Sequence, residues 1–319
     1  MSFGIRRVLK PRRLFKSRLA ICSGGTTSGL KSSIYHKTID KDLVNPPNTH
    51  IAGFGTLNTH KNYFEASAAQ KNGGRFISPS GREWPGAIFK TNVDKTEVRT
   101  GGLATAWGTI DKARTYFGGA ANESFGFVCG GREFDGTTAT PSNKISRYWF
   151  STAITMQSWN VLTISGNPAT SYATSKEIIT VQAGIYNNLE FTSFKSQITG
   201  RGFTAIVGVD TNLINYRVCC NEKQAVLFGG SSLTTYFDNV RRTNISQRLS
   251  FSDYGTLSSG LGGSVAVSSQ KIAMVLKGAS GIFNNLNTIE YFLHKSLISS
   301  FSSGNFGLNK GVQGGYGAA

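Results

Sequence analysis

Acidic residues are scarce in this sequence of 319 residues. It contains 17 Asp and Glu against 34 Lys and Arg, which gives a formal net charge of +17 at pH 7. Charged residues make up 16% of the chain, whereas an average globular protein has roughly 25%. An excess of positive charge favours anionic partners, which include nucleic acid, an anionic membrane surface and an acidic protein surface. Composition alone does not choose among these three.

Long apolar runs are missing, and cysteine and histidine are few. No stretch reaches the ~20 apolar residues that a membrane span requires, so we expect no membrane span. The cysteines show no zinc-site spacing and the histidines lie singly, so we expect no metal, no cofactor and no disulfide framework. With so few acids and histidines, no set of catalytic residues stands out, and we expect no enzymatic activity. The residues concerned are Cys22, Cys129, Cys219, Cys220, His36, His50, His60 and His294.

Glycine is abundant, with 38 residues, and it marks an internal repeat. A short apolar run that closes on glycine occurs six times, and its final glycines are separated by 56, 50, 53, 46 and 48 residues. A strand that turns sharply beside its neighbour needs a positive φ or a close backbone approach, which glycine supplies. The glycines expected at these turns are Gly24, Gly25, Gly81, Gly130, Gly131, Gly184, Gly229, Gly230 and Gly278.

Three further elements recur with the glycine-closed run. One is an alternating strand that usually opens on Asn, as in Asn143–Phe150; another is an aromatic residue followed by glycine, as in Trp107–Gly108. The last is a small apolar strand, as in Tyr116–Ala121. Four short strands in each unit of about fifty residues are typical of a propeller blade. The sequence therefore predicts an all-β fold, a six-bladed β-propeller of four-stranded antiparallel blades.

The two ends of the repeat complement each other. The first unit begins on its glycine-closed strand and has no small apolar strand before it, whereas the chain ends on such a strand. Pairing the two segments would supply the missing strand of the first blade and leave no exposed sheet edge. The residues predicted to close the ring are Leu19, Ala20, Ile21, Cys22, Tyr316, Gly317, Ala318 and Ala319.

A basic segment precedes the repeat. We divide the chain into a basic N-terminal arm, residues 1–17, and a propeller, residues 18–319. Basic residues interrupt every apolar stretch near the start, so we expect no cleaved signal peptide. The arm could be a disordered solubilising segment, could dock into an acidic groove of a neighbouring subunit, or could contact nucleic acid. The docking residues we nominate are Arg6, Arg7, Lys10, Arg12, Arg13, Lys16 and Arg18.

The order of the four elements resembles that of kelch-like, galactose-oxidase-like propellers. The resemblance rests on aromatic-Gly-x-Leu steps such as Phe54–Leu57 and Tyr254–Leu257, and on Gly-Gly strands such as Phe228–Gly230. More specifically, the sequence resembles the divergent kelch-like repeats of virion structural proteins of tailed bacteriophages. That resemblance implies a place in the tail, fibre or baseplate of a virion. The regular Tyr and Trp pair of cellular kelch repeats is missing, which speaks against a cytoskeletal or ubiquitin-ligase adaptor role.

We therefore expect a non-enzymatic virion structural protein, present in multiple copies and docked by its basic arm. Its partners would be other virion structural proteins and a host-surface glycan or receptor, ahead of nucleic acid. The expected contact surfaces are the loops Glu133–Ser142 and Thr56–Gly74. Two alternatives stay open: a carbohydrate-binding or carbohydrate-active propeller, and a nucleic-acid-associated protein acting through the arm.

Overall fold

The computed structural model consists of β-strands, and the residues that it describes contain no helix. The prediction of an all-β fold is therefore confirmed for this part of the chain. Within the same residues, nothing forms a helix long and apolar enough to cross a membrane. The structure describes residues 19–23, 38–43, 50–57, 68–69, 74–83, 88–97, 100–153, 155–165, 168–182, 189–196, 201–203, 216–232, 235–246, 251–262, 264–268, 271–279, 285–294, 301–305 and 315–318.

Most strands form four-stranded antiparallel sheets, which we number I to VI along the chain. Sheet I consists of β27 (Gly315–Ala318), β1 (Leu19–Ser23), β2 (Thr38–Leu43) and β3 (His50–Thr56). Sheet II consists of β4 (Ala68–Ala69), β5 (Arg75–Glu83), β6 (Ile88–Glu97) and β7 (Gly101–Thr109). Sheet III consists of β9 (Gly118–Ala121), β10 (Phe125–Cys129), β13 (Lys144–Trp149) and β14 (Gln157–Val161).

The second half of the chain repeats the same order without interruption. Sheet IV consists of β15 (Pro168–Ala173), β16 (Glu177–Gln182), β17 (Leu189–Ser193) and β18 (Arg201–Phe203). Sheet V consists of β19 (Arg217–Cys220), β20 (Gln224–Phe228), β21 (Asn239–Asn244) and β22 (Ser252–Thr256). Sheet VI consists of β23 (Val265–Ser268), β24 (Ile272–Ala279), β25 (Asn285–Leu293) and β26 (Phe301–Asn305).

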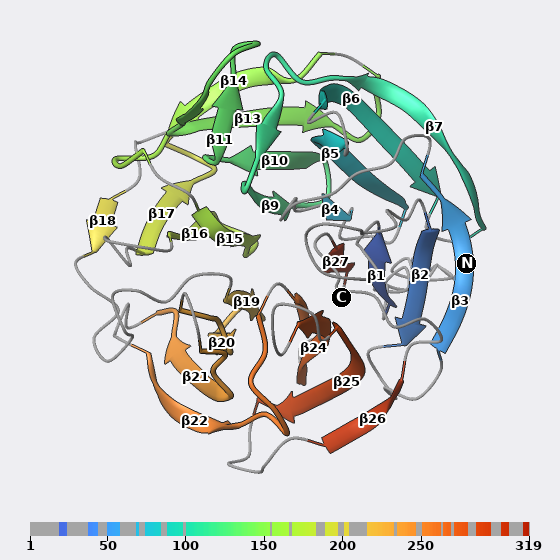
Figure 1. The fold of residues 1–319 in the computed structure, drawn as a ribbon. Coiled ribbons are helices and arrows are strands. Elements are labelled where there is room, and N and C mark those ends of the chain that lie inside the picture. Colours follow the sequence, from blue (N-terminus) through green and yellow to red (C-terminus); the bar gives the residue numbers. More distant parts are fainter. Residues whose placement is uncertain are drawn as a thin grey trace, which may run out of the picture.

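The sheets lie around a common centre with their first strands innermost (Figure 1). The innermost strands lie against one another in turn: β27 against β4 and β23, β9 against β4 and β15, and β19 against β15 and β23. Small residues suit this crowded centre, as in the Gly-Gly-Ala-Ala sequence of β9, which is buried throughout. The small apolar strands of the repeat are thus the innermost strands, which lie nearest the common centre of the sheets.

In sheets II to VI the four recurring sequence elements lie on the four strands in a constant order, whereas the third strand of sheet I, β2, contains no Asn. The small apolar strand is first, the glycine-closed run second, the Asn-opened strand third and the aromatic strand fourth. A register shift between the third and fourth strands recurs at equivalent places, directly before Asp94, Ser146, Arg241 and Glu290. These shifts give a structural alignment of the units that does not depend on sequence similarity.

Two features of the sheets were not predicted. The outer strands β3 and β7 pair in parallel at Gly55 with Gly102 and at Thr56 with Leu103, which joins sheets I and II into eight strands. A separate three-stranded sheet forms from β8 (Arg114–Thr115), β11 (Arg132–Phe134) and β12 (Ala139–Pro141). β11 and β12 lie in the connection between the second and third strands of sheet III, and β8 lies in the linker before its first strand. The segment predicted as a loop, Glu133–Ser142, is therefore largely a hairpin.

Apolar side chains fill the space between successive sheets. Ile77 and Val93 of sheet II pack with Val128 and Tyr148 of sheet III, and similar clusters lie between sheets III and IV, IV and V, and V and VI. These clusters join sheets II to VI into one packed body.

Buried carboxylates add polar links across these boundaries. Glu190 on β17 accepts hydrogen bonds from the amides of Thr163 (2.7 Å) and Ile164 (3.3 Å), which follow the last strand of sheet III. Glu290 on β25 accepts bonds from the amide (2.9 Å) and the hydroxyl (2.7 Å) of Ser258, which follows the last strand of sheet V. Each carboxylate therefore ties its own sheet to the loop leaving the sheet before it.

Candidate interaction surface

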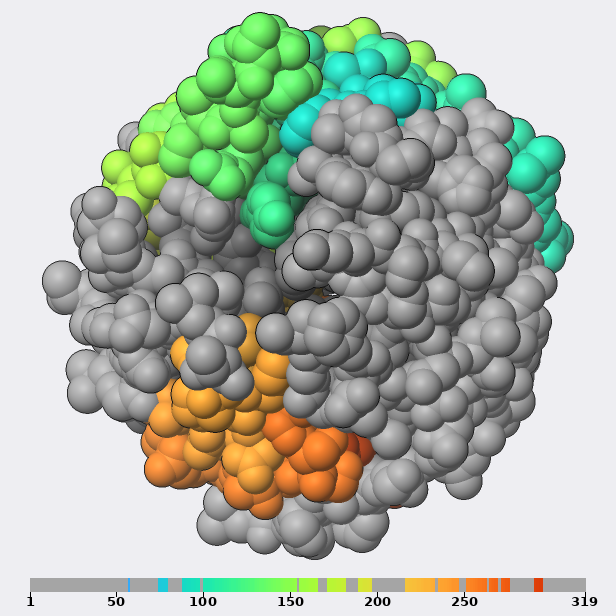
Figure 2. All heavy atoms as spheres, viewed as in Figure 1, coloured from blue at the N-terminus to red at the C-terminus, as the bar shows by residue number. Residues whose placement is uncertain are grey.

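The three-stranded sheet of β8, β11 and β12 is the one described element that departs from the repeat, and it carries an exposed tip. It lies in front of sheet III on the face seen in Figures 1 and 2, where the green residues of this region stand out at the surface. Residues 135–138 at its tip are all exposed. We call the hairpin of β11 and β12, Arg132–Pro141, the insertion. A hairpin that protrudes from a rigid body is a common place for binding residues.

The tip is shaped by its own hydrogen bonds. Asp135 Oδ1 accepts bonds from the amides of Thr137 (3.0 Å) and Thr138 (2.8 Å), and the hydroxyls of both threonines donate to the same carboxylate. These amide bonds, first that of Thr138, hold the pKa of Asp135 well below its usual range. Gly136 takes a φ of 105°, which glycine adopts without steric cost. The tip therefore has a defined conformation although it is exposed.

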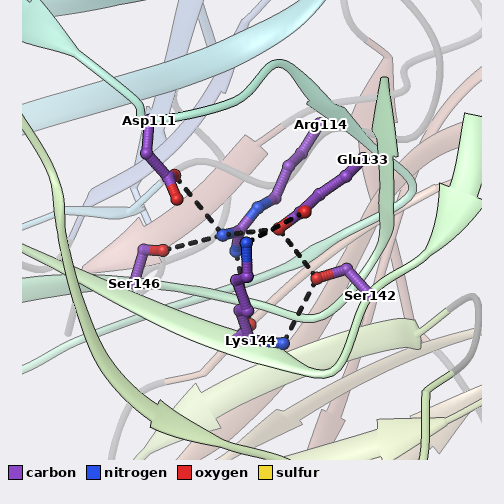
Figure 3. A network of polar contacts seen from close by, with 6 residues as sticks. All are labelled: Asp111, Arg114, Glu133, Ser142, Lys144 and Ser146. Carbon is purple, nitrogen blue, oxygen red and sulfur yellow. Dashed lines mark hydrogen bonds and ion pairs between the residues drawn. The ribbon is translucent and has the colours of Figure 1, made fainter. Parts of the chain in front are cut away.

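A buried arginine anchors the base of the insertion (Figure 3). Arg114 is 0% exposed, and its Nη2 lies 3.0 Å from Glu133 Oε1 of β11 and 2.9 Å from Ser146 Oγ of β13. The same nitrogen lies 3.4 Å from Asp111 Oδ1. Its Nη1 donates to the Lys144 carbonyl (3.3 Å). One guanidinium thus connects β8, β11 and β13, which belong to two sheets.

The second oxygen of the same carboxylate completes the network. Ser142 Oγ donates to Glu133 Oε1 (2.9 Å), and Lys144 Nζ donates to Glu133 Oε2 (3.1 Å). Burial alone would raise the pKa of Glu133, but the Arg114 charge and the bonds from Ser142 and Lys144 outweigh it and hold that pKa below its ordinary value. Burial lowers the pKa of Arg114. A buried ion pair of this kind fixes geometry more than it adds stability.

In sheet III, the network around Arg114 lies where other sheets have a carboxylate that bonds to the loop leaving the preceding sheet. Ser146 follows the register shift in sheet III as Glu290 does in sheet VI. Where Glu290 reaches the loop that leaves the preceding sheet, Ser146 is too short, and Arg114 from that loop reaches back to it instead. The insertion supplies Glu133 as the compensating charge.

A ring stack joins the insertion to sheet II. The rings of Phe134 on β11 and Phe89 on β6 are 3.8 Å apart between centroids, with 15° between their planes. The insertion is therefore fixed from two sides, by a polar network on sheet III and by an aromatic contact on sheet II.

No group of three or more His, Cys, Asp or Glu side chains within the described residues is placed to hold a metal ion. Ser268 Oγ lies 2.8 Å from His294 Nε2, but both residues are buried, at 7% and 2% exposure. Burial also raises the pKa of Cys129 to about 11 and that of Cys219 to about 12, so these thiols stay protonated at neutral pH.

The structure places the sequence-predicted residues unevenly. The docking-arm residues, Arg6 to Arg18, lie outside the described residues, as do Ala319 and most of the Thr56–Gly74 loop. β1 and β27 pair antiparallel, with Leu19 opposite Ala318, Ala20 opposite Gly317, Ile21 opposite Tyr316 and Cys22 opposite Gly315.

The predicted turn glycines fall into three groups. Gly130, Gly131, Gly229 and Gly230 follow their strands with positive φ. Gly81 and Gly278 instead lie inside β5 and β24, each directly after a register shift, where an irregular strand bends. Gly24, Gly25 and Gly184 lie outside the described residues.

Sequence reasoning missed Arg114 and treated Glu133 only as the start of a loop. The available indication was the connection from Gly131 to Asn143, which is longer than that from Gly230 to Asn239. It did not reveal that Arg114, in the preceding linker, would pair with the insertion, because that contact joins residues far apart in the sequence.

No protein-family model matches this sequence, and a search of curated proteins finds no significant match.

Proposed function

We propose that the six four-stranded sheets are the blades of a propeller closed by the pairing of β27 with β1. The antiparallel register of these two strands supports closure, because it supplies sheet I with its innermost strand. The succession of contacts among the innermost strands, from β27 through β4 to β23 and back to β27, supports it as well. Closure of this kind completes the first blade, leaves only short, protected sheet edges and yields a rigid body.

On this body, the protein acts as a non-enzymatic structural and interaction component of a tailed-phage virion, in its tail, fibre or baseplate. The observation that carries the interaction role is the insertion: its exposed tip is held in one shape by Asp135, and its base is held by the buried Arg114–Glu133 pair. A rigid, protruding tip suits contact with another protein, because little conformational freedom is lost on binding. The placement in a virion is drawn from the kelch-like resemblance.

The basic arm, residues 1–17, docks the propeller in the assembly. Arginine outnumbers lysine in this segment, and guanidinium groups pair with carboxylates in a fork geometry. An acidic groove on a neighbouring subunit is the matching surface, and several copies of the chain would occupy equivalent places in the particle.

The test is quantitative mass spectrometry of purified phage particles from the strain that carries this gene. The proposal predicts the chain at a fixed ratio to the other structural proteins. Its absence from purified particles would overturn the virion role. A chain lacking residues 1–17 should fold normally but be lost from particles; normal incorporation of that variant would rule out the docking arm and leave the structural role intact.

A nucleic-acid role is the second candidate, favoured by the formal charge of +17. It predicts binding to nucleic acid that weakens steeply as salt rises from 50 to 200 mM, about a thousandfold or more for six or more phosphate contacts. Binding that changes little with salt would exclude it.

A further inference from the structure

The clearest unassigned feature lies on sheet III, at the end where β13 finishes. Trp149, the last residue of β13, is 37% exposed. Its ring lies 4.3 Å from that of Phe125, measured between centroids. The guanidinium of Arg147 lies 4.8 Å from the Phe125 centroid and 5.5 Å from the Trp149 centroid. Two rings and one cation thus form a compact cluster, which we call the Arg147 cluster.

Equivalent residues of other sheets show what a cation does at this position. Lys95 in sheet II, Arg147 in sheet III and Arg242 in sheet V all lie on the third strand, at the second residue after the register shift. Lys95 lies 4.3 Å from the Trp107 ring centroid and 3.3 Å from Glu97 Oε1. The cation in sheet II therefore has a carboxylate partner, which it shares with Arg75.

The sheet V residue is engaged in a similar way. Arg242 lies 4.3 Å from the Tyr254 ring centroid and donates to the His294 carbonyl of sheet VI at 3.1 Å. It therefore helps to fasten one sheet to the next.

Among the described residues, Arg147 has neither a carboxylate nor a carbonyl of the next sheet as a partner. Its Nε is buried without a hydrogen-bond partner, and no carboxylate among the described residues forms an ion pair with it. At the boundary between sheets III and IV, aromatic rings take the place of a contact from Arg147. Trp159 and Phe127 pack on Phe194, at centroid distances of 6.3 and 5.4 Å. A fixed charge at this place therefore serves no contact between sheets that the described residues show.

We infer that the Arg147 cluster is a binding site for a carboxylate-bearing sugar, such as a uronic acid residue of an acidic glycan. The C–H face of a sugar ring packs on the π face of an exposed indole, and a guanidinium binds a carboxylate through two parallel hydrogen bonds. The loop after Trp149 is exposed and carries two hydroxyls, Ser151 Oγ and Thr152 Oγ1, 3.4 Å apart. Because they follow Trp149 directly in the chain and are exposed, these hydroxyls can exchange hydrogen bonds with the hydroxyl groups of a glycan.

Local charge favours a sugar over a nucleic acid. A nucleic acid strand requires a row of cations that follows its phosphates. The cluster around Trp107 holds two cations, but Glu97 lies 3.3 Å from both Arg75 Nε and Lys95 Nζ and neutralises one of the two charges. One guanidinium with no ion pair among the described residues, beside one exposed ring, matches a single acidic sugar residue. The inference goes beyond the proposed scaffold role and does not depend on it.

The experiment measures binding of glucuronate to the purified full chain by saturation-transfer NMR, with glucose as the uncharged probe. We expect glucuronate to bind and glucose to bind at least tenfold more weakly, because a charge-assisted pair contributes about that factor or more. Arg147→Met should reduce glucuronate affinity by about tenfold or more, and Trp149→Ala should reduce the affinity for both sugars.

Two control variants separate the site from fold and charge effects. Arg242→Met changes the same position in sheet V, and Lys223→Met removes the same charge from an exposed turn; both should bind glucuronate as the unmodified chain does. Circular dichroism and urea unfolding report whether each variant folds. The inference is overturned if the folded chain does not bind glucuronate, or if Arg147→Met binds it unchanged. It is also overturned if Arg147→Met loses affinity for a thymidine oligonucleotide only, which would assign the cluster to nucleic acid.

Discussion

Nη2 of Arg114 lies 3.0 Å from Oε1 of Glu133, and the two residues are 0% and 8% exposed. They join the linker before sheet III to the insertion within it. A buried charge that loses its partner costs much more than an exposed one, because neither water nor another charge replaces the lost interaction.

The first prediction concerns this pair. Arg114→Met should lower the free energy of unfolding by about 3 kcal/mol, since it leaves the Glu133 carboxylate buried without its main countercharge. Urea unfolding followed by circular dichroism measures the change. The double variant Arg114→Met, Glu133→Gln should lose clearly less than the sum of the two single variants. Additive losses would mean that the pair does not act as a unit.

The second prediction is the pH dependence of the same contact. The folded-state pKa of Glu133 is held below its ordinary value of 4.5, so its ionised form stabilises the fold above that pH. The stability difference between the unmodified chain and Glu133→Gln should be constant near neutral pH. It should shrink as the pH falls below 4.5 and through the folded-state pKa. A difference that persists unchanged in acid would contradict the assignment.

The third prediction tests the links between sheets. Glu290→Gln weakens a buried carboxylate that accepts two bonds from Ser258, and it should lower the free energy of unfolding by about 1 to 3 kcal/mol. The matched control is Asp253→Asn. Asp253 pairs with Arg241 at 3.2 Å but its side chain is 86% exposed, so this change should cost less than about 0.5 kcal/mol. Equal losses from the two variants would argue against a special role for the buried link.

Much of this architecture could be predicted from the repeat alone. The glycine-closed run predicted β10 and β20 closely, because an apolar run ended by a glycine pair with positive φ leaves few alternatives. The order of the four strands follows from the order of the four elements. These features are local, so the sequence near each strand contains the information that determines it.

The insertion and the Arg147 cluster could not be predicted in this way. The pairing of Arg114 with Glu133, and the choice of Arg147 to lie on Phe125 and not on Trp159, depend on contacts between residues distant in the chain. Arg147 also looks like Arg242 in sequence, but Arg242 bonds to the next sheet, whereas Phe194 fills the corresponding boundary beside Arg147. Such differences depend on how side chains pack between sheets, which the sequence pattern of a single strand does not determine.

The fourth prediction compares two glycines with positive φ. A Cβ at Gly131 would lie 2.6 Å from the Thr115 carbonyl oxygen and 2.9 Å from Phe117 Cβ, whereas one at Gly136 would meet nothing within 4 Å. Gly131→Ala therefore adds a steric clash to the backbone strain and should cost more than about 2 kcal/mol of unfolding free energy. Gly136→Ala should cost about 1 to 2 kcal/mol, from backbone strain alone. Thermal unfolding of both variants distinguishes the two cases.

Closure of the propeller is the central claim, and the register of β1 and β27 offers a direct test. Cys22 lies opposite Gly315. In a chain whose other three cysteines are replaced by serine, Gly315→Cys places a second thiol opposite the native one. Antiparallel partners that face each other can lie within disulfide distance.

The measurement is peptide mass spectrometry after mild oxidation, with Tyr316→Cys as the control one position out of register. The account predicts a disulfide between positions 22 and 315, formed readily in the folded chain, and little or none between positions 22 and 316. Equal crosslinking of both variants, or crosslinking of neither in a chain that is folded by circular dichroism, would contradict a ring closed by the C-terminal strand.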